Sequence, residues 1–546
     1  MGQLRSITSV FAATIRNAAL LRLELAFATF NGAEWAVWVS LLVYAYTVGG
    51  ATASGVMALV QLVPCALLSP YFGALTDRRR AGRVLFVSYL VMGVAMAVVA
   101  LVMALDAPAP LVFVLAVVIN LAITVPRPAQ SALLPSVVRL PVELTAANVV
   151  SSWAENGSVL IAPALAGVLL GVGGPALAIG ALAVLGFVGA WLVWPIPGPP
   201  PLAREESARP VTAEINESLR VVAREPSVRV LVGLLGSQYV LVGALDVLYV
   251  VLAMSVLGMG EGGAGFLNAA FGAGGIIGAA VTATLVARRR LAPALMMGIL
   301  TAALALGVLG LYPSRLGAFA LLAMAGLGRT VFDVTGRILL QRSAPPGILA
   351  RVFSLLESLM DFGLALGSVL VPVLVGLSGA RAALLGTSAV FLALVALTWR
   401  RLSRIDAAAD VPQVEIQLLQ SVPIFAPLPA PELEGLARAL RPVSAAAGQA
   451  VIREGDPGDC LYAIAKGRVR VTKRGSEVAT LARGDAFGEI ALIEDVPRTA
   501  TVTAVEDAEL FTLDKEPFIV ALTGHAPAAR AAGDMVSRRL GELEAF

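Results

Sequence analysis

Long apolar runs separated by short polar segments fill roughly the first 400 residues of the chain. Runs of about 20 residues have the length that a helix needs to cross the hydrocarbon core of a bilayer. They predict twelve membrane-spanning helices, at residues 20–47, 51–75, 84–105, 110–136, 146–172, 175–195, 227–257, 262–286, 291–312, 315–340, 351–377 and 379–399. A Pro-rich and then charged segment, Pro195–Pro226, separates the first six from the last six. The sequence therefore predicts an α-helical membrane protein with two six-helix halves.

The pattern changes near the C-terminus. Short alternating segments with glycine turn signals run from Val443 to Leu513 and predict β-strands. Apolar periodicity predicts helices in Leu418–Leu440 before the strands, and in Pro517–Thr523 and Ala526–Leu543 after them. We predict a first helical half at 1–195, a linker at 196–226, a second half at 227–404, a linker at 405–417 and a C-terminal domain at 418–546.

Composition supports this division. Hydrophobic residues make up 58% of the 546 residues and charged residues 14%, whereas soluble proteins average about 25% charged residues. No lysine precedes Lys466, so the last part of the chain differs from the rest. Cys65 and Cys460 are far apart and are expected to be unpaired, as on a reduced cytoplasmic face. We expect no cleaved signal peptide, because no small-residue cleavage site follows a short apolar run.

The distribution of arginine predicts the orientation, since loops on the cytoplasmic side collect positive charge. If both termini lie on that side, the inner loops contain the clusters Arg78–Arg80, Arg288–Arg290 and Arg400–Arg404. The outer loops then contain only Arg315 and Arg381. The sequence therefore predicts an integral protein of a bacterial-type inner membrane, with both termini and the C-terminal domain in the cytoplasm.

The loop after the second span reads GALTDRRRAGR and begins at Gly73. Two sets of six helices with this loop resemble the major facilitator superfamily of secondary transporters. The resemblance implies that Gly73, Asp77 and Arg78 form a latch between the halves in the outward-facing state. Gly82 lies two places later than in the commonest motif, and the corresponding loop Ala287–Arg290 lacks an acid. The alternative for these residues is an ordinary positively charged loop.

Polar and ionisable residues inside the spans are further candidates, because such groups are costly in a bilayer unless they are paired or face a cavity. Asn31 and Glu34 in the first span, Glu155 in the fifth and Asp246 in the seventh are candidates for substrate or proton binding. Structural pairing is the alternative for each of them.

Other intramembrane residues favour structural roles. Arg329, Asp333 and Arg337 recur every four residues and predict an ion-paired strut, and Glu357 is expected to pair with Arg351 or Arg342. Three glycine pairs predict close helix packing, namely Gly167/Gly171, Gly274/Gly278 and Gly363/Gly367. The first span, the Arg-rich loop and residues Ala146–Gly171 also resemble the drug and siderophore exporters of the superfamily, which favours efflux.

The stretch Phe487–Val502, FGEIALIEDVPRTATV, is suited to a cyclic phosphodiester. Such a ligand needs an arginine for its negative charge, free backbone N–H groups for its oxygens and an acceptor for its ribose hydroxyl. Glu489 and Arg498 lie nine positions apart on this Gly-led segment. An edge turn with an Arg–Glu salt bridge is the alternative.

The same stretch resembles the phosphate-binding cassette of the cyclic-nucleotide-binding family, whose fold is a jelly roll with flanking helices. The resemblance implies that Glu489 binds the ribose hydroxyl and Arg498 the phosphate, and that Thr499 contacts guanine. It implies a nucleotide site made of Gly488, Glu489, Ile490, Ala491, Arg498, Thr499 and Ala500, with cAMP or cGMP as regulatory ligand. The last helix would act as a lid, with Met535, Val536, Arg538 and Arg539 as candidate contacts.

We therefore expect a transporter, driven by protons, that exports a small molecule by alternating access and is modulated by a cyclic nucleotide. One alternative is a membrane-anchored nucleotide receptor that does not transport, and another is export of the cyclic nucleotide itself. An enzyme is not expected, because His525 is the one histidine and no metal or nucleophile cluster is visible. The expected partners are the lipid bilayer, a cyclic nucleotide and a small-molecule substrate. Nucleic acid is not expected, since no helix-turn-helix follows the domain.

Overall fold

The computed structural model describes residues 17–138, 141–196, 198, 220, 222–285, 290–344, 348–408, 412–523 and 525–544; in 69–78 and at several other positions it describes the backbone only. The chain divides into two compact units. One, the helical unit, comprises Thr14–Arg139 and Ala147–Ala409, and the other consists mainly of Asp410–Phe546.

Five helices form the first half of the helical unit: α2 (Ala18–Arg78), α3 (Ala81–Ala104), α4 (Ala109–Ile123), α5 (Pro126–Val137) and α6 (Pro141–Val193). Asn17 caps α2 by accepting a hydrogen bond from the Leu20 N–H. Both long helices turn back at a glycine pair, Gly49–Gly50 in α2 and Gly173–Gly174 in α6. Gly50 and Gly174 have φ of 64° and 70°, a conformation that residues with a side chain rarely adopt.

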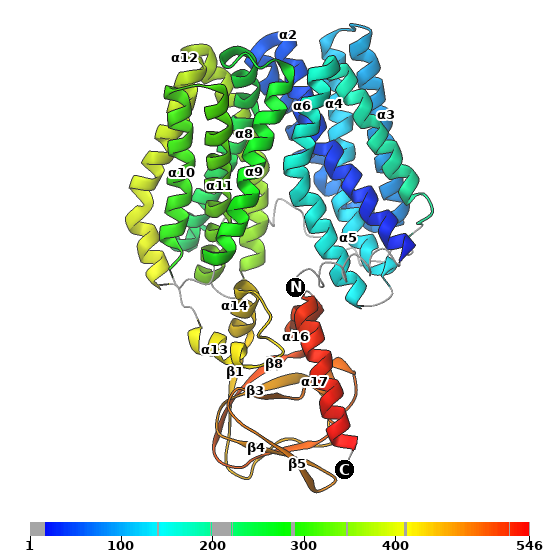
Figure 1. Ribbon diagram of the computed structural model, residues 1–546, viewed down its shortest axis with the longest axis vertical. Coiled ribbons are helices and arrows are strands. Elements are labelled where there is room, and N and C mark those ends of the chain that lie inside the picture. Colours follow the sequence, from blue (N-terminus) through cyan, green and yellow to red (C-terminus); the bar gives the residue numbers. More distant parts are fainter. Residues whose placement is uncertain are drawn as a thin grey trace. The chain divides into compact units, whose positions relative to one another are not determined.

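The second half contains α8 (Pro226–Val251), the π-helical turn η1 (Leu252–Val256), α9 (Glu261–Leu285), α10 (Ala292–Leu311), α11 (Arg315–Ser343) and α12 (Leu349–Ala408). The last of these helices turns back at Gly379. Within the described ranges, nine helices are long and apolar enough to cross a membrane. Three of these helices, α2, α6 and α12, reverse direction at a glycine, so the nine supply twelve membrane-length segments, as the apolar runs predict. Figure 1 shows α2–α6 and α8–α12 as two bundles side by side.

The two halves approach closely at the end of the bundle that carries the glycine turns, which we call the distal end. A Cβ added to Gly262 of α9 would lie 2.4 Å from the carbonyl oxygen of Gly167 of α6, so only glycine fits there. Close packing is also confirmed within the second half, where a Cβ on Gly274 or Gly367 would overlap the backbone of Ala323 or Val240.

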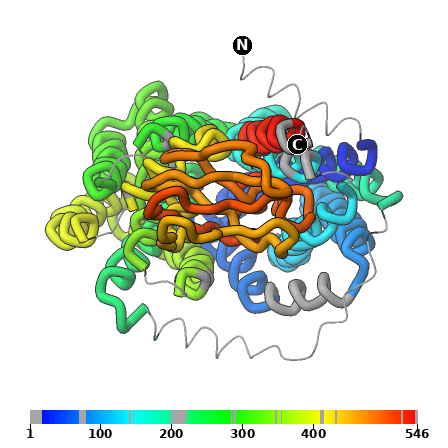
Figure 2. The backbone as a smooth tube through the Cα atoms, turned by 90° about the horizontal axis from the view of Figure 1, so that it is seen from below, coloured from blue at the N-terminus to red at the C-terminus, as the bar shows by residue number. Residues whose placement is uncertain are grey.

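The C-terminal unit is a β sandwich, and helices precede and follow its strands in the sequence. Helices α13 (Gln413–Ser421) and α14 (Ala430–Ala439) precede eight strands, β1 (Arg441–Ala445), β2 (Ala450–Ile452), β3 (Cys460–Lys466), β4 (Val469–Lys473), β5 (Ser476–Leu481), β6 (Ala486–Phe487), β7 (Thr501–Ala504) and β8 (Ala508–Asp514). The short helix α15 (Glu489–Ile493) follows β6, and α16 (Lys515–Thr523) and α17 (Ala526–Glu544) follow β8. The strands form two antiparallel sheets, β1-β8-β3-β6 and β2-β7-β4-β5, and Figure 2 shows strands of this unit as neighbouring tubes coloured from gold to red-orange.

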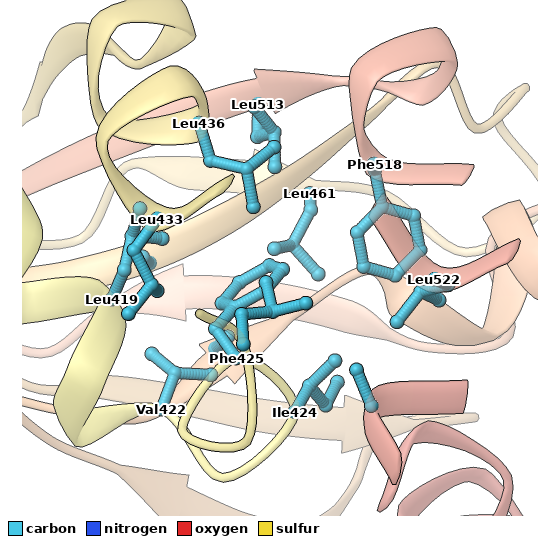
Figure 3. Packing of buried hydrophobic residues seen from close by; sticks show 14 of the residues in the cluster. Leu419, Val422, Ile424, Phe425, Leu433, Leu436, Leu461, Leu513, Phe518 and Leu522 are labelled. Atoms are coloured by element: carbon cyan, nitrogen blue, oxygen red, sulfur yellow. The ribbon is translucent and has the colours of Figure 1, made fainter. Parts of the chain in front are cut away.

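One apolar cluster joins the flanking helices of this unit to the first sheet. Phe425 and Phe518 meet edge to face with ring centroids 6.0 Å apart, surrounded by leucines that include Leu419 and Leu461 (Figure 3). Met535 of α17 belongs to the same cluster. Since burying a large apolar side chain stabilises a fold by about 1.5–3 kcal/mol, α13, α14, α16 and α17 are held together by one shared core.

Candidate functional site

Gly488 begins the segment that shapes the candidate nucleotide site. Its φ of 92° ends β6 and starts α15. A Cβ at this position would lie 2.5 Å from Nη1 of Arg498 and 3.2 Å from the carbonyl oxygen of Cys460. The first-turn N–H groups of α15, including that of Ile490, have no partner inside the helix and remain available to an acceptor. A glycine is therefore required both for the turn and for the approach of Arg498.

Arg498 is held rigidly, with 5% of its side chain exposed. Its guanidinium donates hydrogen bonds to the carbonyl oxygens of Gly488 (3.0 Å) and Cys460 (2.8 Å). Asp459 approaches it at 3.5 Å, and the ring centroid of Tyr462 lies 6.0 Å from its Cζ. A fixed, desolvated guanidinium at a pocket wall is suited to an anion with one charge.

An open pocket with an empty volume of about 630 Å³, its solvent-filled mouth included, contains all seven of the predicted nucleotide-site residues. They are Gly488, Glu489, Ile490, Ala491, Arg498, Thr499 and Ala500. The lining also contains apolar residues, including Val471 from β4 and Val478 from β5. The pocket thus combines charged and apolar groups.

The last helix, α17, contacts this pocket through two residues. Glu489 is 1% exposed, and its Oε1 accepts a hydrogen bond of 2.7 Å from Nη1 of Arg539. The same nitrogen donates to the carbonyl oxygen of Ala486 (2.7 Å), and Val536 packs on Ile490. Of the predicted lid contacts, Arg539 therefore lines the pocket, and Val536 packs with Ile490 and Ala500, which also line it.

The other two predicted lid residues lie elsewhere. Met535 belongs to the apolar cluster of Figure 3, and Arg538 is exposed. The pairing of Arg539 with Glu489 was not predicted, because it depends on the rotation of a helix 50 residues further along the chain.

The thiol nearest to the pocket belongs to Cys460, whose Sγ lies 3.9 Å from Nη2 of Arg498. Burial raises the pKa of the Cys460 thiol, and burial with the Cys460 hydrogen bond raises the pKa of Tyr462 to about 12. Both groups are therefore neutral at physiological pH. Cys460 and Cys65 are unpaired, as expected. His525, expected at the surface, is 27% exposed and lies 3.9 Å from Glu432.

In the helical unit, three of the predicted candidates converge on one arginine. Arg127 of α5 donates to both carboxylate oxygens of Glu34 at 2.7 Å and to Asn31 Oδ1 at 3.2 Å. Glu155 of α6 lies 3.6 Å from Arg127 Nε. The sequence analysis missed Arg127, although an arginine between two prolines inside an apolar span is itself a signal of an intramembrane charge.

The fourth candidate joins the two halves. Asp246 of α8, 9% exposed, accepts a hydrogen bond of 3.2 Å from the indole N–H of Trp38 on α2. A small cavity beside it is lined by Tyr249 and Asn268. The structure describes only the backbone at the three residues of the predicted latch, Gly73, Asp77 and Arg78, so their side-chain contacts lie outside the described part of the chain.

The predicted strut on α11 is formed only in part. Arg337 lies 3.3 Å from Asp333 and 3.3 Å from Glu357, which is a partner that the sequence analysis did not name for Glu357. Gln238 of α8 donates to Asp333. The Nε of Arg329 is buried and has no hydrogen-bond partner among the described residues. Among the described residues Asp333 pairs with Arg337 and forms no ion pair with Arg329, so the expectation that Arg329 shares the strut is wrong.

The apolar bundle defines a membrane protein, and the pocket defines a ligand-binding domain attached to it. The family model of the Major Facilitator Superfamily matches residues 23–322 and 247–454, and that of the cyclic nucleotide-binding domain matches residues 442–524. The first match spans more than half of the chain. The protein belongs to the major facilitator superfamily and carries a C-terminal cyclic nucleotide-binding domain, and neither family is enzymatic.

Curated relatives and solved structures resemble a short part of this chain. The cAMP-dependent protein kinase regulatory subunit of Yarrowia lipolytica is 46% identical over 102 residues, which are 18% of this chain and 27% of that protein. That of Eremothecium gossypii is 39% identical over 137 residues, 25% of this chain and 30% of that protein. The chain thus spans less than a third of the length of these two curated relatives.

A solved structure of the regulatory domain of Toxoplasma gondii PKA with cAMP is 33% identical and covers 20% of this chain and 44% of that one. Its TM-score of 0.20 is too low for a comparison of folds.

Proposed function

We propose that this protein is a secondary active transporter that exports a small molecule by alternating access, driven by protons, and that a cyclic nucleotide bound to its C-terminal domain modulates it. The observation that carries the proposal is one pocket that contains a buried Arg498 and a buried Glu489, in a chain of the major facilitator superfamily.

The pocket suggests a role for each of its parts. Arg498 neutralises the cyclic phosphate, and the N–H groups of Ile490 and Ala491 bind its oxygens. Glu489 keeps Oε1 on Arg539 and accepts the ribose 2′-hydroxyl with Oε2. The purine lies against the apolar wall around Val471. The names of the kinase relatives favour cAMP, whereas Thr499 is suited to a contact with guanine, so cAMP and cGMP are both candidates.

The shared core supplies a route for modulation. Ala528, Ala532 and Met535 of α17 lie in the same cluster as Leu419 of α13 and Phe425. A ligand that repositions α17 therefore alters the packing of α13, which follows directly after the last membrane helix in the sequence. A coupling free energy of about 1–3 kcal/mol is typical of such regulation.

The helical unit supplies the features that transport requires. The halves are in contact at the distal end through Gly167 and Gly262, and Trp38 binds Asp246 across them. If the arginine-rich end faces the cytoplasm, as the sequence predicts, this contact lies on the outer side, as an inward-facing arrangement requires. Charged networks around Arg127 and Arg337 lie in both halves, and these costly groups favour a working transporter over a receptor with an inert anchor.

Calorimetric titration of the purified full-length protein with cAMP, cGMP and non-cyclic AMP tests the nucleotide site. We expect saturable binding of a cyclic nucleotide, no binding of AMP, and loss of binding in Arg498→Ala. Failure of all three ligands to bind the wild-type protein would refute a nucleotide sensor.

A further inference from the structure

A buried polar cluster lies in the first half of the helical unit, close to the Arg127 site. Glu24 of α2 is 3% exposed, and its Oε2 accepts a hydrogen bond of 2.7 Å from Ser151 Oγ on α6. Ser151 Oγ in turn accepts one of 3.3 Å from Gln130 Nε2 on α5. The other carboxyl oxygen, Glu24 Oε1, is buried and has no hydrogen-bond partner in the part of the chain that the structure describes.

The titratable and charged groups around this cluster come from four helices: Arg22 and Glu34 on α2, Tyr89 on α3, Arg127 on α5 and Glu155 on α6. Arg22 is exposed. Tyr89 is fully buried, interacts electrostatically with both Glu24 and Arg127, and has a hydroxyl without a described partner. Among the described residues Glu24 forms no ion pair, because the guanidinium of Arg127 is bound by Glu34 and approached by Glu155.

Two carboxylates, those of Glu34 and Glu155, therefore hold this guanidinium, and the carboxyl group of Glu24 has no ion-pair partner among the described residues. Glu34 holds the guanidinium with two charge-assisted hydrogen bonds, to both of its carboxyl oxygens. An isolated carboxylate in an apolar interior is strongly unfavourable and takes up a proton instead. The sequence named Glu34 as one candidate for substrate or proton binding, with structural pairing as the alternative. The contacts favour pairing for Glu34 and proton binding for Glu24.

We propose that Glu24 is a proton-binding site of the first half, protonated in this conformation, and that Arg127 is the cation that compensates it after the proton leaves. Loss of the proton leaves a buried carboxylate, which attracts Arg127 away from Glu34 and Glu155. Proton release is thereby linked to a rearrangement of the charged network between α2, α5 and α6. The role of this step in transport rests on the proposed proton coupling, whereas the protonation of Glu24 does not.

Infrared spectroscopy of the full-length protein in lipid nanodiscs measures the protonation state without a transport substrate. At neutral pH we expect the carbonyl-stretch region of protonated carboxyl groups to contain a band that disappears in Glu24→Gln. Glu357→Gln is the matched control, since that half-exposed carboxylate is paired with Arg337, and it should leave the band intact. A band that persists in Glu24→Gln would overturn the proposal.

Two further variants keep the test decisive. Ser151→Ala retains the carboxyl group but removes its hydrogen bond, so the frequency of the band must shift, even if Glu24→Gln fails to fold. Glu34→Gln frees Arg127, so the band should disappear at a lower pH than in the wild type. An unchanged frequency in the first variant or an unchanged titration in the second would contradict the proposal.

The outcomes also separate this inference from the proposed function. A Glu24 band in a protein whose transport proves independent of a proton gradient would refute proton coupling and leave the site standing. The absence of the band in a proton-driven transporter would refute the Glu24 site alone.

Discussion

Replacement of Arg498 is the most informative change in the nucleotide pocket. The side chain is 5% exposed, and its two terminal nitrogens lie beside the backbone of Gly488 and of Cys460. A hydrogen bond to a charged group contributes about 1.5–3 kcal/mol, so two such bonds to a cyclic phosphate would contribute about 3–6 kcal/mol. Because about 1.4 kcal/mol corresponds to a factor of ten in Kd, Arg498→Ala should weaken binding by roughly 10²–10⁴-fold. Arg498→Lys retains the charge but not the two-pronged geometry, and it should fall between the wild type and Arg498→Ala.

Titration calorimetry with cAMP measures these affinities, and thermal unfolding provides the necessary check on the fold. Arg498→Ala leaves the carbonyl oxygens of Gly488 and Cys460 without their donor, so some loss of stability is expected as well. Arg470→Ala is the matched control, because Arg470 is half-exposed on β4 and pairs with Glu477. It should bind cAMP like the wild type. A folded Arg498→Ala protein that binds cAMP within about threefold of the wild type would refute the assigned role of Arg498.

Three other substitutions test the remaining parts of the pocket. Glu489→Gln should weaken the binding of cAMP by about tenfold, which corresponds to the loss of one charge-assisted hydrogen bond, but should leave the binding of 2′-deoxy-cAMP nearly unchanged. Equal losses of affinity for both ligands in calorimetry would exclude a bond to the ribose hydroxyl. Thr499→Ala should lower the affinity for cGMP several-fold and leave that for cAMP unchanged, and an unchanged ratio of the two would remove Thr499 from base selection. Gly488→Ala should destabilise the C-terminal unit by about 1–3 kcal/mol in denaturant unfolding, since it forces a side chain into a φ of 92° beside Arg498; a stability equal to that of the wild type would show that the turn tolerates a side chain.

The main elements of the fold could be predicted because their signals are local. Apolar runs of about 20 residues located the membrane segments, and the glycine pair Gly49–Gly50 fell between two of them where α2 turns back. The cassette residues all lie within one short stretch of sequence, which was sufficient to group Gly488 with Arg498 around a pocket.

The pairings between distant elements could not be predicted in the same way. Arg127 meets Glu34 across 93 residues, and Arg539 meets Glu489 across 50. Such contacts depend on how each helix is rotated about its axis, which apolar periodicity fixes only roughly. For the same reason Arg329 was assigned to a strut from its spacing alone, although spacing of four residues permits a contact without requiring it.

The central claim is that nucleotide binding in the C-terminal unit changes the helical unit. Hydrogen–deuterium exchange of the full-length protein in nanodiscs, with cAMP, cGMP or AMP, tests this claim without knowledge of the substrate. We predict that the effective cyclic nucleotide slows exchange in α15 and α17, alters exchange at helix ends of the helical unit, and does neither in Arg498→Ala. Protection confined to residues 410–546, with every peptide of the helical unit unchanged, would contradict the account.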